Sequence, residues 1–251
     1  MKYDLSSVGI HRNLQYECIT TTINSDRKKN SAAFAFIYLG DDQVMCRIFE
    51  GSKSLENIKQ TKRYVVNITQ DPLIFTLSTI DKLPDEYYTD DEDIAILKDS
   101  GAYLVIDVDE IEMKTPEDFP IKNDTNIYFI TGTIRDFVIR DESAQAFNRG
   151  FSGLIESLVN CSRYKIVGGE KKKYYKDRLE ENKRVIEKVS DEKTKKAMEI
   201  LAEEYEKNWF LKKNNIGRIY FPSQYNLSCG IVLFKIPKST STFMKASTLA
   251  L

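Results

Sequence analysis

The stretch that decides the fold runs from Arg47 to Thr69 and reads RIFEGSKSLENIKQTKRYVVNIT. Its pattern predicts a strand, a tight turn, a short helix and a second strand. The turn, Gly51-Ser52-Lys53-Ser54, combines a flexible glycine, two hydroxyls and a lysine directly before the helix. Because backbone N–H groups point outward at the start of a helix and its dipole favours an anion there, such a turn can hold a phosphate. The alternative is that Ser54 serves only as the N-cap of the helix.

Length and composition bound the class of protein. The chain has 251 residues, of which 41% are apolar, so one large domain, or one domain with a substantial appendage, can bury a sizeable core. A net charge of -1 argues against bulk binding of nucleic acid or acidic membranes. No signal-peptide pattern opens the chain, and no apolar run approaches the ~20 residues that cross a bilayer. We therefore expect a soluble, cytoplasmic protein with no nucleic-acid or membrane partner.

Side chains for nucleophilic catalysis or metal binding are sparse. The chain has a single histidine, His11, and no CxxC pair among its four cysteines, which are Cys18, Cys46, Cys161 and Cys229. Unpaired cysteines in apolar surroundings are typical of reduced, buried thiols in a cytosolic protein. The acidic residues between Asp81 and Asp99 are not spaced like a calcium loop, which favours a solvated segment. The sequence therefore predicts no metal site and identifies no catalytic acid, base or nucleophile.

The order of the expected elements indicates the fold class. Apolar and β-branched runs bounded by turn residues predict six strands, at Tyr16–Ile23, Ser31–Leu39, Val44–Phe49, Arg63–Thr69, Ala102–Met113 and Ile127–Arg140. The segment Pro72–Ile80 leaves helix and strand open. Two or three helices follow, and the first carries apolar residues at helical spacing on one face: Phe147, Phe151, Leu154, Ile155, Leu158 and Val159. The fold class is therefore α+β, an antiparallel barrel or sandwich followed by a helical appendage.

This order also predicts three parts of the chain. Residues 1–145 form the barrel, and residues 146–215 form a helical subdomain packed on it. Residues 216–251 supply one or two added strands and a loose tail rich in Ser and Thr. The runs of lysine and glutamate in the helical part are most simply the solvated faces of a helical hairpin.

An ordered set of short motifs carries a resemblance to a known family. Along the chain these motifs are Tyr16-Glu17, Thr20-Thr21-Thr22, Asn30-Ser31-Ala32-Ala33, Phe49–Ser54 with Asn57, Val66–Thr69 and Asp71-Pro72. They are similar to motifs of an uncharacterised, mainly archaeal family that resembles a branch of the flavin-reductase-like split barrels. The similarity is good from about Tyr16 to Ile80, looser as far as Arg163 and thin beyond Gly168. No single motif is diagnostic, but the ordered set is.

The resemblance implies an antiparallel split barrel that binds FMN and forms homodimers. The positions that it assigns to FMN are Ser31, Ser52, Lys53 and Ser54 for the phosphate, Ala32 and Ala33 for the ring with Thr21 or Thr22 lining its pocket, and Asn57 and Asn67 bracing the turn or the ribityl chain. Arg47 points either at the flavin or at solvent. The family usually carries a proline and a glycine after the position of Asn30, and here Phe34 or Phe36 is expected to crowd or reshape the ring pocket.

Two functions remain as alternatives. The first is an FMN-binding flavoprotein, with NAD(P)H-linked oxidoreductase activity on an unidentified substrate. Flavin chemistry belongs to the cofactor, so the lack of a catalytic histidine or cysteine is no objection to it. No GxGxxG fingerprint is present, so NAD(P)H would dock transiently over the flavin. The second function is a non-catalytic dimeric binding module, in which the turn is structural or holds another phosphorylated ligand.

Overall fold

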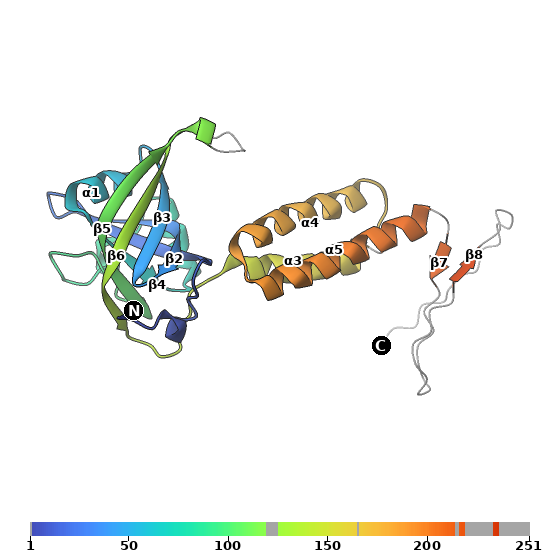
Figure 1. The fold of residues 1–251 in the computed structure, drawn as a ribbon, viewed down its shortest axis with the longest axis horizontal. Helices are drawn as coiled ribbons and strands as arrows, with labels where there is room; N and C mark the ends of the chain where they lie inside the picture. The colour runs from blue at the N-terminus through green and yellow to red at the C-terminus, as the bar shows by residue number, and fades with distance from the viewer. Residues whose placement is uncertain (1, 119–124, 165, 214–215, 219–232, 236–251) are drawn as a thin grey trace.

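The protein consists of a six-stranded barrel from which helices project to one side (Figure 1). The computed structural model describes residues 2–118, 125–164, 166–213, 216–218 and 233–235. The antiparallel strands follow the order β1-β2-β3-β6-β5-β4, with bounds β1 Gln15–Ile23, β2 Lys29–Gly40, β3 Gln43–Phe49, β4 Arg63–Ile68, β5 Ala102–Lys114 and β6 Ile127–Ile139. The predicted α+β fold, an antiparallel barrel followed by helices, is confirmed.

The pairing between β2 and β3 covers only part of the two strands. It runs from the turn at Gly40 and Gln43 as far as Phe36 and Cys46. Beyond that point, within the described residues, positions 29–35 of β2 pair with β1 alone and positions 47–49 of β3 pair with β6 alone. The barrel is therefore split between β2 and β3, and α1 (Lys53–Thr61) follows β3 at this end.

Alternate strand residues fill the barrel, because successive side chains of a strand point to opposite faces. The buried side chains of this core are at most 5% exposed and include Tyr16, Cys18, Phe36, Cys46, Ile48, Val66 and Ile106. Leu55 and Ile58 of α1 join the same cluster, so the apolar face of this helix covers the barrel interior. The outward-facing positions remain for the surface of the barrel.

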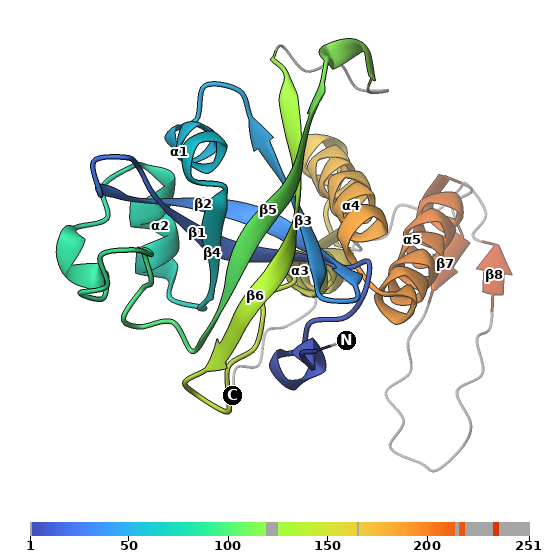
Figure 2. The same cartoon turned by 60° about the vertical axis from the view of Figure 1, so that its left-hand side comes forward.

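A second layer covers the outside of β1 and β2 (Figure 2). It consists of α2 (Pro72–Thr79) and the segment that follows, which bury Ile19 of β1 against Ile74, Tyr88 and Leu97. The sequence left helix and strand open for α2. The helix forms because the carboxylate of Asp71 accepts hydrogen bonds from the N–H groups of Leu73 (2.7 Å) and Ile74 (3.2 Å), an N-cap with proline at the first position.

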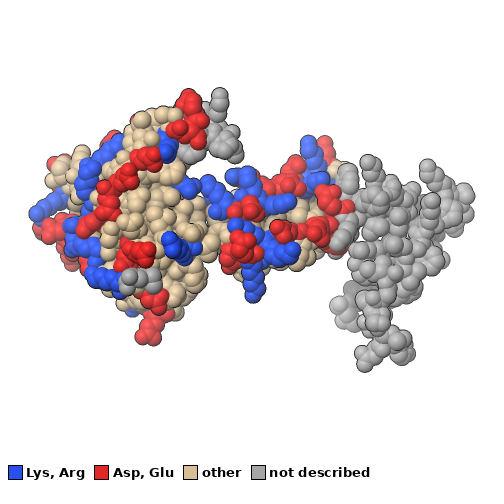
Figure 3. Space-filling view, in the orientation of Figure 1, with Lys and Arg blue, Asp and Glu red and all other residues tan. Residues whose placement is uncertain are grey.

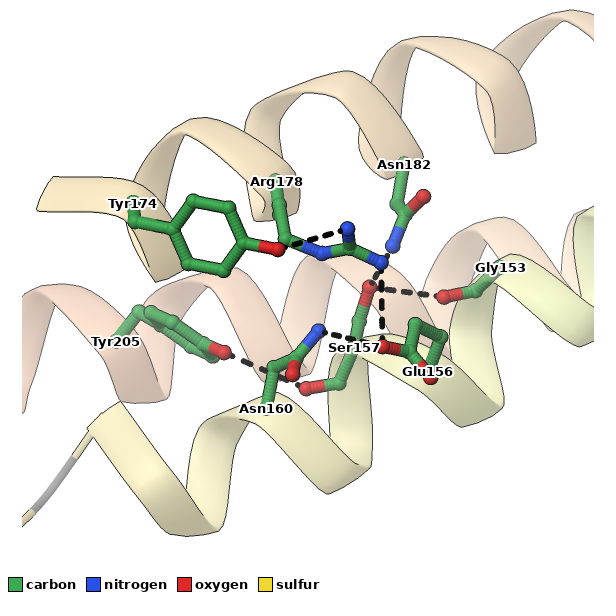
Figure 4. A network of polar contacts seen from close by, with 8 residues as sticks. All are labelled: Gly153, Glu156, Ser157, Asn160, Tyr174, Arg178, Asn182 and Tyr205. Atoms are coloured by element: carbon green, nitrogen blue, oxygen red, sulfur yellow. Dashed lines mark hydrogen bonds and ion pairs between the residues drawn. The ribbon is translucent and has the colours of Figure 1, made fainter. Parts of the chain in front are cut away.

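The helical part consists of α3 (Arg149–Tyr164), α4 (Gly169–Val189) and α5 (Glu192–Lys213). Its core contains Leu154, Cys161, Tyr164, Leu179, Ile186, Met198, Leu201 and Tyr205. Figure 4 shows the polar contacts beside this core: Asn182 of α4 donates to Ser157 of α3 (2.9 Å), and the phenol of Tyr205 on α5 donates to the backbone oxygen of Ser157 (3.4 Å). Ser157 therefore links all three helices.

The remaining elements are short. Single 3-10 turns lie at Leu5–Val8, Asp85–Tyr87 and Pro116–Asp118. Strands β7 (Ile216–Arg218) and β8 (Leu233–Lys235) pair antiparallel with each other. The rest of the predicted C-terminal part, at 219–232 and 236–251, lies outside the described residues.

One face of α3 is apolar and exposed. Of the six side chains that define the predicted apolar face, Leu154 alone is buried, while the others are between 36% and 61% exposed: Phe147, Phe151, Ile155, Leu158 and Val159. We call these five side chains the α3 stripe. The helix packs on α4 and α5 through Leu154, Ser157, Cys161 and Tyr164, so its buried face is rotated away from the stripe. The stripe has no covering element within the described chain.

Candidate functional site

The outer side of the turn before α1 is exposed, and its inner side packs against the protein. Gly51 has φ +81, a left-handed conformation that favours glycine, and no atom lies within 4 Å of where its Cβ would be. The N-cap is Ser52, whose hydroxyl accepts from the N–H of Leu55 (3.2 Å), so the alternative that assigned the cap to Ser54 is wrong. The helix begins at Lys53, which leaves the N–H groups of Lys53 and Ser54 without partners inside the helix.

The side chains of the turn already have protein partners. Lys53 is exposed and forms an ion pair with Asp81. Ser54 is buried, and its hydroxyl accepts a hydrogen bond from the amide of Asn30 at 2.9 Å. This bond places the start of β2 against the start of α1, which brings Ser31 close to the turn. A phosphate at this turn would therefore meet backbone N–H groups and the mobile head of Lys53.

The outer face of β2 presents small side chains beside the split. Ser31, Ala33 and Ala35 alternate with Phe34 and Phe36, which pack into the barrel interior. Both phenylalanines therefore point away from the outer face of the strand, and the crowding of the ring pocket by Phe34 or Phe36 stays a prediction. Ala33 and Ala35 are half-buried. Small side chains along an unpaired strand edge allow a planar group to approach the backbone closely.

Arg47 lies on the opposite side of the split. Its register partner on β6 is Phe129, and its guanidinium lies 5.1 Å from the centre of that ring. The Nε atom is buried and has no hydrogen-bond partner among the described residues. Burial lowers the pKa of Arg47, although an arginine remains charged. A buried donor without a partner is costly, so a ligand acceptor at this position would satisfy it.

Thr21 and Asn67 connect β1 and β4 to the covering layer. The Asn67 amide donates to the backbone oxygen of Ile19 (3.0 Å) and to the hydroxyl of Thr21 (2.9 Å), and its oxygen accepts from the N–H of Leu97 (3.0 Å). Thr21 in turn donates to the backbone oxygen of Ala95. Both side chains are fully buried, so they are surrounded by protein atoms of the described residues.

Thr22 and Asn57 form a second buried side-chain hydrogen bond. The Asn57 amide donates to the hydroxyl of Thr22 at 2.9 Å, which fixes α1 to β1. The structure thus places seven of the predicted site residues around the split: Ser31, Ala32, Ala33, Arg47, Ser52, Lys53 and Ser54. The other four lie deeper, on β1, β4 and α1: Thr21, Thr22, Asn57 and Asn67. Sequence reasoning missed Asn30, Ala35 and Phe129, of which Ala35 is signalled by the alternation of small residues in Ser-Ala-Ala-Phe-Ala.

The candidate position for a mononucleotide is the strand edge at the split and not the enclosed cavity nearby. A separate cavity of about 70 Å³ lies between Thr21, Arg63, Val65 and Ile94. Ligand pockets usually measure about 300–1,000 Å³, so this cavity is too small for a flavin. The split offers an anion position at the turn, a face of small residues and an unpartnered donor at Arg47. These three features fit the phosphate and the ring of FMN.

The other candidates for a site are metal ligands and cysteines. No group of three or more His, Cys, Asp or Glu side chains is placed to hold a metal ion within the described chain. Cys18, Cys46 and Cys161 are buried thiols that form no disulfide among the described residues. Burial raises the pKa of the Cys46 thiol to about 12, so it is not a thiolate at neutral pH. None of the helices in the described part has the length and apolarity that a bilayer crossing needs.

Comparisons with known proteins give a family and a set of similar folds. Two models described as "Protein of unknown function (DUF447)", one of them for the N-terminal domain, match residues 16–141 and 148–203. An FMN-bound DUF447 protein from Methanosarcina mazei is 24% identical with a TM-score of 0.46, over 80% of this chain and 100% of that one. A putative flavin reductase with a split barrel domain from Shewanella frigidimarina is 18% identical with a TM-score of 0.40, over 50% and 67% of the two chains. The flavin reductase HpaC complexed with NADP+ is 18% identical with a TM-score of 0.40, over 55% and 85%.

Proposed function

This chain belongs to the DUF447 family of proteins of unknown function, and we propose that it is a flavoprotein that binds FMN in the split between β2 and β3. The observation that carries the proposal is the unpaired edge of β2, with its small outward side chains, lying between the α1 turn and the unpartnered Nε of Arg47. The turn supplies an anion position, the edge supplies close approach, and Arg47 supplies a donor.

Each residue has a task in this arrangement. The N–H groups of Lys53 and Ser54, the Lys53 ammonium and the Ser31 hydroxyl hold the phosphate dianion. The backbone beside Ala32 and Ala33 meets the ring. The hydrogen bonds of four buried residues fix β1, β4 and α1 around the site: Thr21, Thr22, Asn57 and Asn67. Bound flavin would supply the redox chemistry, and the protein binds, orients and shields it.

The proposed activity is an NAD(P)H-linked oxidoreductase reaction in the cytoplasm. The chain carries no dinucleotide fingerprint, so the nicotinamide donor would dock transiently over the flavin at the edge of β2. On the outer face of β2, Ala33 packs against the layer that contains α2, and the half-buried Ala35 leaves the rest of the edge accessible in the single chain.

We further propose that the protein is a homodimer joined through the α3 stripe. A row of apolar side chains on a helix can pack against the same row of a second copy related by a two-fold axis. The stripe begins beside the site, since the backbone oxygen of Phe147 accepts from the N–H of Glu17 on β1 at 2.8 Å. A second copy seated there would also lie near the split, which is consistent with a shared site.

One observation favours a second function, a dimeric module with no flavin. Lys53 is paired with Asp81, and the hydroxyl of Ser54 already has a partner in Asn30. In that case the turn is a helix start with its side chains satisfied, or it holds a different phosphorylated ligand.

An absorbance spectrum distinguishes the two functions. The protein is measured as purified, and again after FMN is added and the excess removed. A flavoprotein retains absorbance near ~450 nm. Absence of flavin in both samples contradicts the FMN proposal and leaves the binding module.

Substitution of Lys53 tests the phosphate position. Lys53→Ala removes a charge-assisted contact worth about 1.5–3 kcal/mol, so the Kd for FMN should rise about tenfold or more. Lys59→Ala is the matched control, because Lys59 lies on the same helix but stacks on Tyr128 at its other end. Equal affinity in Lys53→Ala and the wild type would exclude a phosphate at this turn.

A further inference from the structure

The outer face of β2 carries a lysine at the end of the strand that lies against α1. Because side chains alternate along a strand, the face that carries Ser31 and Ala33 also carries Lys29, the first residue of β2. The amide of the next residue, Asn30, donates to the hydroxyl of Ser54 at 2.9 Å, so this end of β2 lies against the start of α1. The strand therefore presents a cation, then a hydroxyl, then small side chains, in the direction from the α1 turn to the ring position.

The covering layer holds the ammonium of Lys29 in place. Its Nζ atom donates to the backbone oxygen of Thr89 at 2.5 Å and lies 5.9 Å from the centre of the Tyr88 ring. Tyr88 is 3% exposed, so this ring is a fixed part of the layer. A lysine ammonium has three donors, and Thr89 takes one of them. Since no further bond of this ammonium forms within the described residues, two donors remain for a ligand.

Lys29 is also a cation without a carboxylate partner in the part of the chain that the structure describes. Asp85 and Asp90, which flank the contacted segment in the sequence, are exposed and form no ion pair with it. Glu92 pairs instead with Arg27 at 2.6 Å. On the face that Figure 3 shows, basic and acidic side chains are intermixed over the barrel, so a cation without such a partner is a local feature.

Lys53, the lysine of the α1 turn, differs from Lys29 in its charge balance. Lys53 forms an ion pair with Asp81, and the two side chains are 67% and 60% exposed. A phosphate monoester carries about -1.5 to -2 charges at pH 7, and Lys53 adds no net charge while Asp81 stays beside it. A half-buried ammonium that is already held at Thr89 also loses less side-chain freedom on binding than an exposed one does.

We infer that Lys29 binds the phosphate group of the ligand, beside Ser31 and the α1 turn, and supplies the net positive charge that the pair of Lys53 with Asp81 lacks. This inference rests on the proposed function and deepens it, because the phosphate residues expected from the sequence do not include Lys29. A hydrogen bond from an ammonium to a phosphate oxygen is charge-assisted at both ends and is therefore strong. Affinity for FMN should depend on Lys29, whereas affinity for riboflavin, which has no phosphate, should not.

Fluorescence titration of the flavin-free protein with FMN and with riboflavin tests the inference. Lys29→Gln should raise the Kd for FMN about tenfold or more and leave the Kd for riboflavin within about twofold of the wild type. Lys28→Gln is the matched control, because Lys28 is the neighbouring lysine, is exposed, and gives the same change of net charge. Its Kd for FMN should stay within about threefold of the wild type.

Three results with the flavins overturn the inference. They are FMN affinity in Lys29→Gln equal to that of the wild type, an equal loss in Lys28→Gln, and a loss for riboflavin as large as that for FMN, which would indicate a structural role.

Failure of the FMN proposal gives a different result, a wild-type protein that takes up neither flavin. Calorimetric titration with inorganic phosphate then tests Lys29 by itself. Phosphate binding that is lost in Lys29→Gln and kept in Lys28→Gln supports the assignment of Lys29. Absence of phosphate binding in the wild type, or equal binding by the two variants, overturns it.

Discussion

A single amide, that of Asn67, joins three segments that are distant in the sequence. Its bonds reach Ile19, Thr21 and Leu97, which are 48, 46 and 30 residues away. Asn67→Ala should lower the free energy of unfolding by about 3 kcal/mol, because it leaves buried groups without partners. Urea unfolding measures this loss. Asn126→Ala is the control: its amide bonds to the exposed Glu50, so the loss should stay below about 1 kcal/mol.

The roles of such residues could not be derived from the sequence. Val66-Asn67-Ile68 shows a polar residue in an apolar strand. This pattern is equally typical of a ligand contact and of a buried structural hydrogen bond. The distinction depends on atoms from Ile19 and Leu97, whose proximity to Asn67 arises only in the folded chain. The Ser52–Ser54 turn was different, because its hydroxyls, lysine and glycine act locally and appear together in the sequence.

The buried thiol of Cys46 makes stability depend on alkaline pH. Its pKa is about 12 in the folded protein against an ordinary 9.0, because burial disfavours the thiolate. The folded state therefore keeps a proton that the unfolded state releases, so stability is full below pH 9 and falls as the pH rises towards 12. Between about pH 8 and about pH 10 this group should remove about 1.4 kcal/mol. Urea unfolding of Cys46→Val should show a smaller pH-dependent loss by that amount; an identical loss would contradict it.

At the scale of the element, the turn before α1 supplies the N-cap of the helix, and its proposed second role is to hold the phosphate. Ser52→Asp separates the two roles, since aspartate also accepts from the N–H of Leu55 but adds a negative charge. The free energy of unfolding should stay within about 0.5 kcal/mol of the wild type. The Kd for FMN should rise at least about tenfold through repulsion of the phosphate. Thermal unfolding and flavin fluorescence measure the two quantities.

Ser52→Ala is the companion variant for this helix. It removes the cap hydroxyl without adding charge, so it should cost about 1 kcal/mol of stability. Retained FMN affinity in Ser52→Asp would show that the turn acts as a cap and nothing more.

Helix α3 shows what periodicity can and cannot predict about an element. The spacing of Phe151, Ile155 and Leu158 correctly indicated a helix. It did not indicate which face packs inward, because Leu154 and Cys161 complete a second apolar face about 100° away. Ser157 lies on the face that packs inward: its hydroxyl accepts from Asn182 of α4, and its backbone oxygen accepts from Tyr205 of α5.

At the scale of the whole molecule, the α3 stripe predicts the oligomeric state. Phe151→Lys/Ile155→Lys places two charges in the proposed interface and should convert a dimer to a monomer at micromolar concentration. Size-exclusion chromatography with light scattering measures the mass. Ile200→Lys is the control, because Ile200 of α5 is also exposed but lies off the stripe. A wild-type monomer, or a dimer that survives the double substitution, contradicts this interface.

The sequence predicted the six strands and their antiparallel arrangement better than it predicted their closure. Turns such as Gly40-Asp41-Asp42 identify neighbouring strands, since short loops join adjacent antiparallel partners. The contact of β3 with β6, which closes the barrel, joins Arg47 to Phe129 across 82 residues and has no local signal. The split has no local signal either, because it depends on where the pairing of β2 with β3 ends, and only the family resemblance implied it.

That split also exposes the chain to unwanted assembly. The edge of β2 at residues 29–35 carries backbone donors and acceptors with no strand beside them in the described fold. Such an edge is a template on which a strand from another molecule can add, and a charged residue such as Lys29 discourages the addition. A ligand seated against the edge would block that template outright. Riboflavin supply during expression would then govern how much of the protein escapes aggregation.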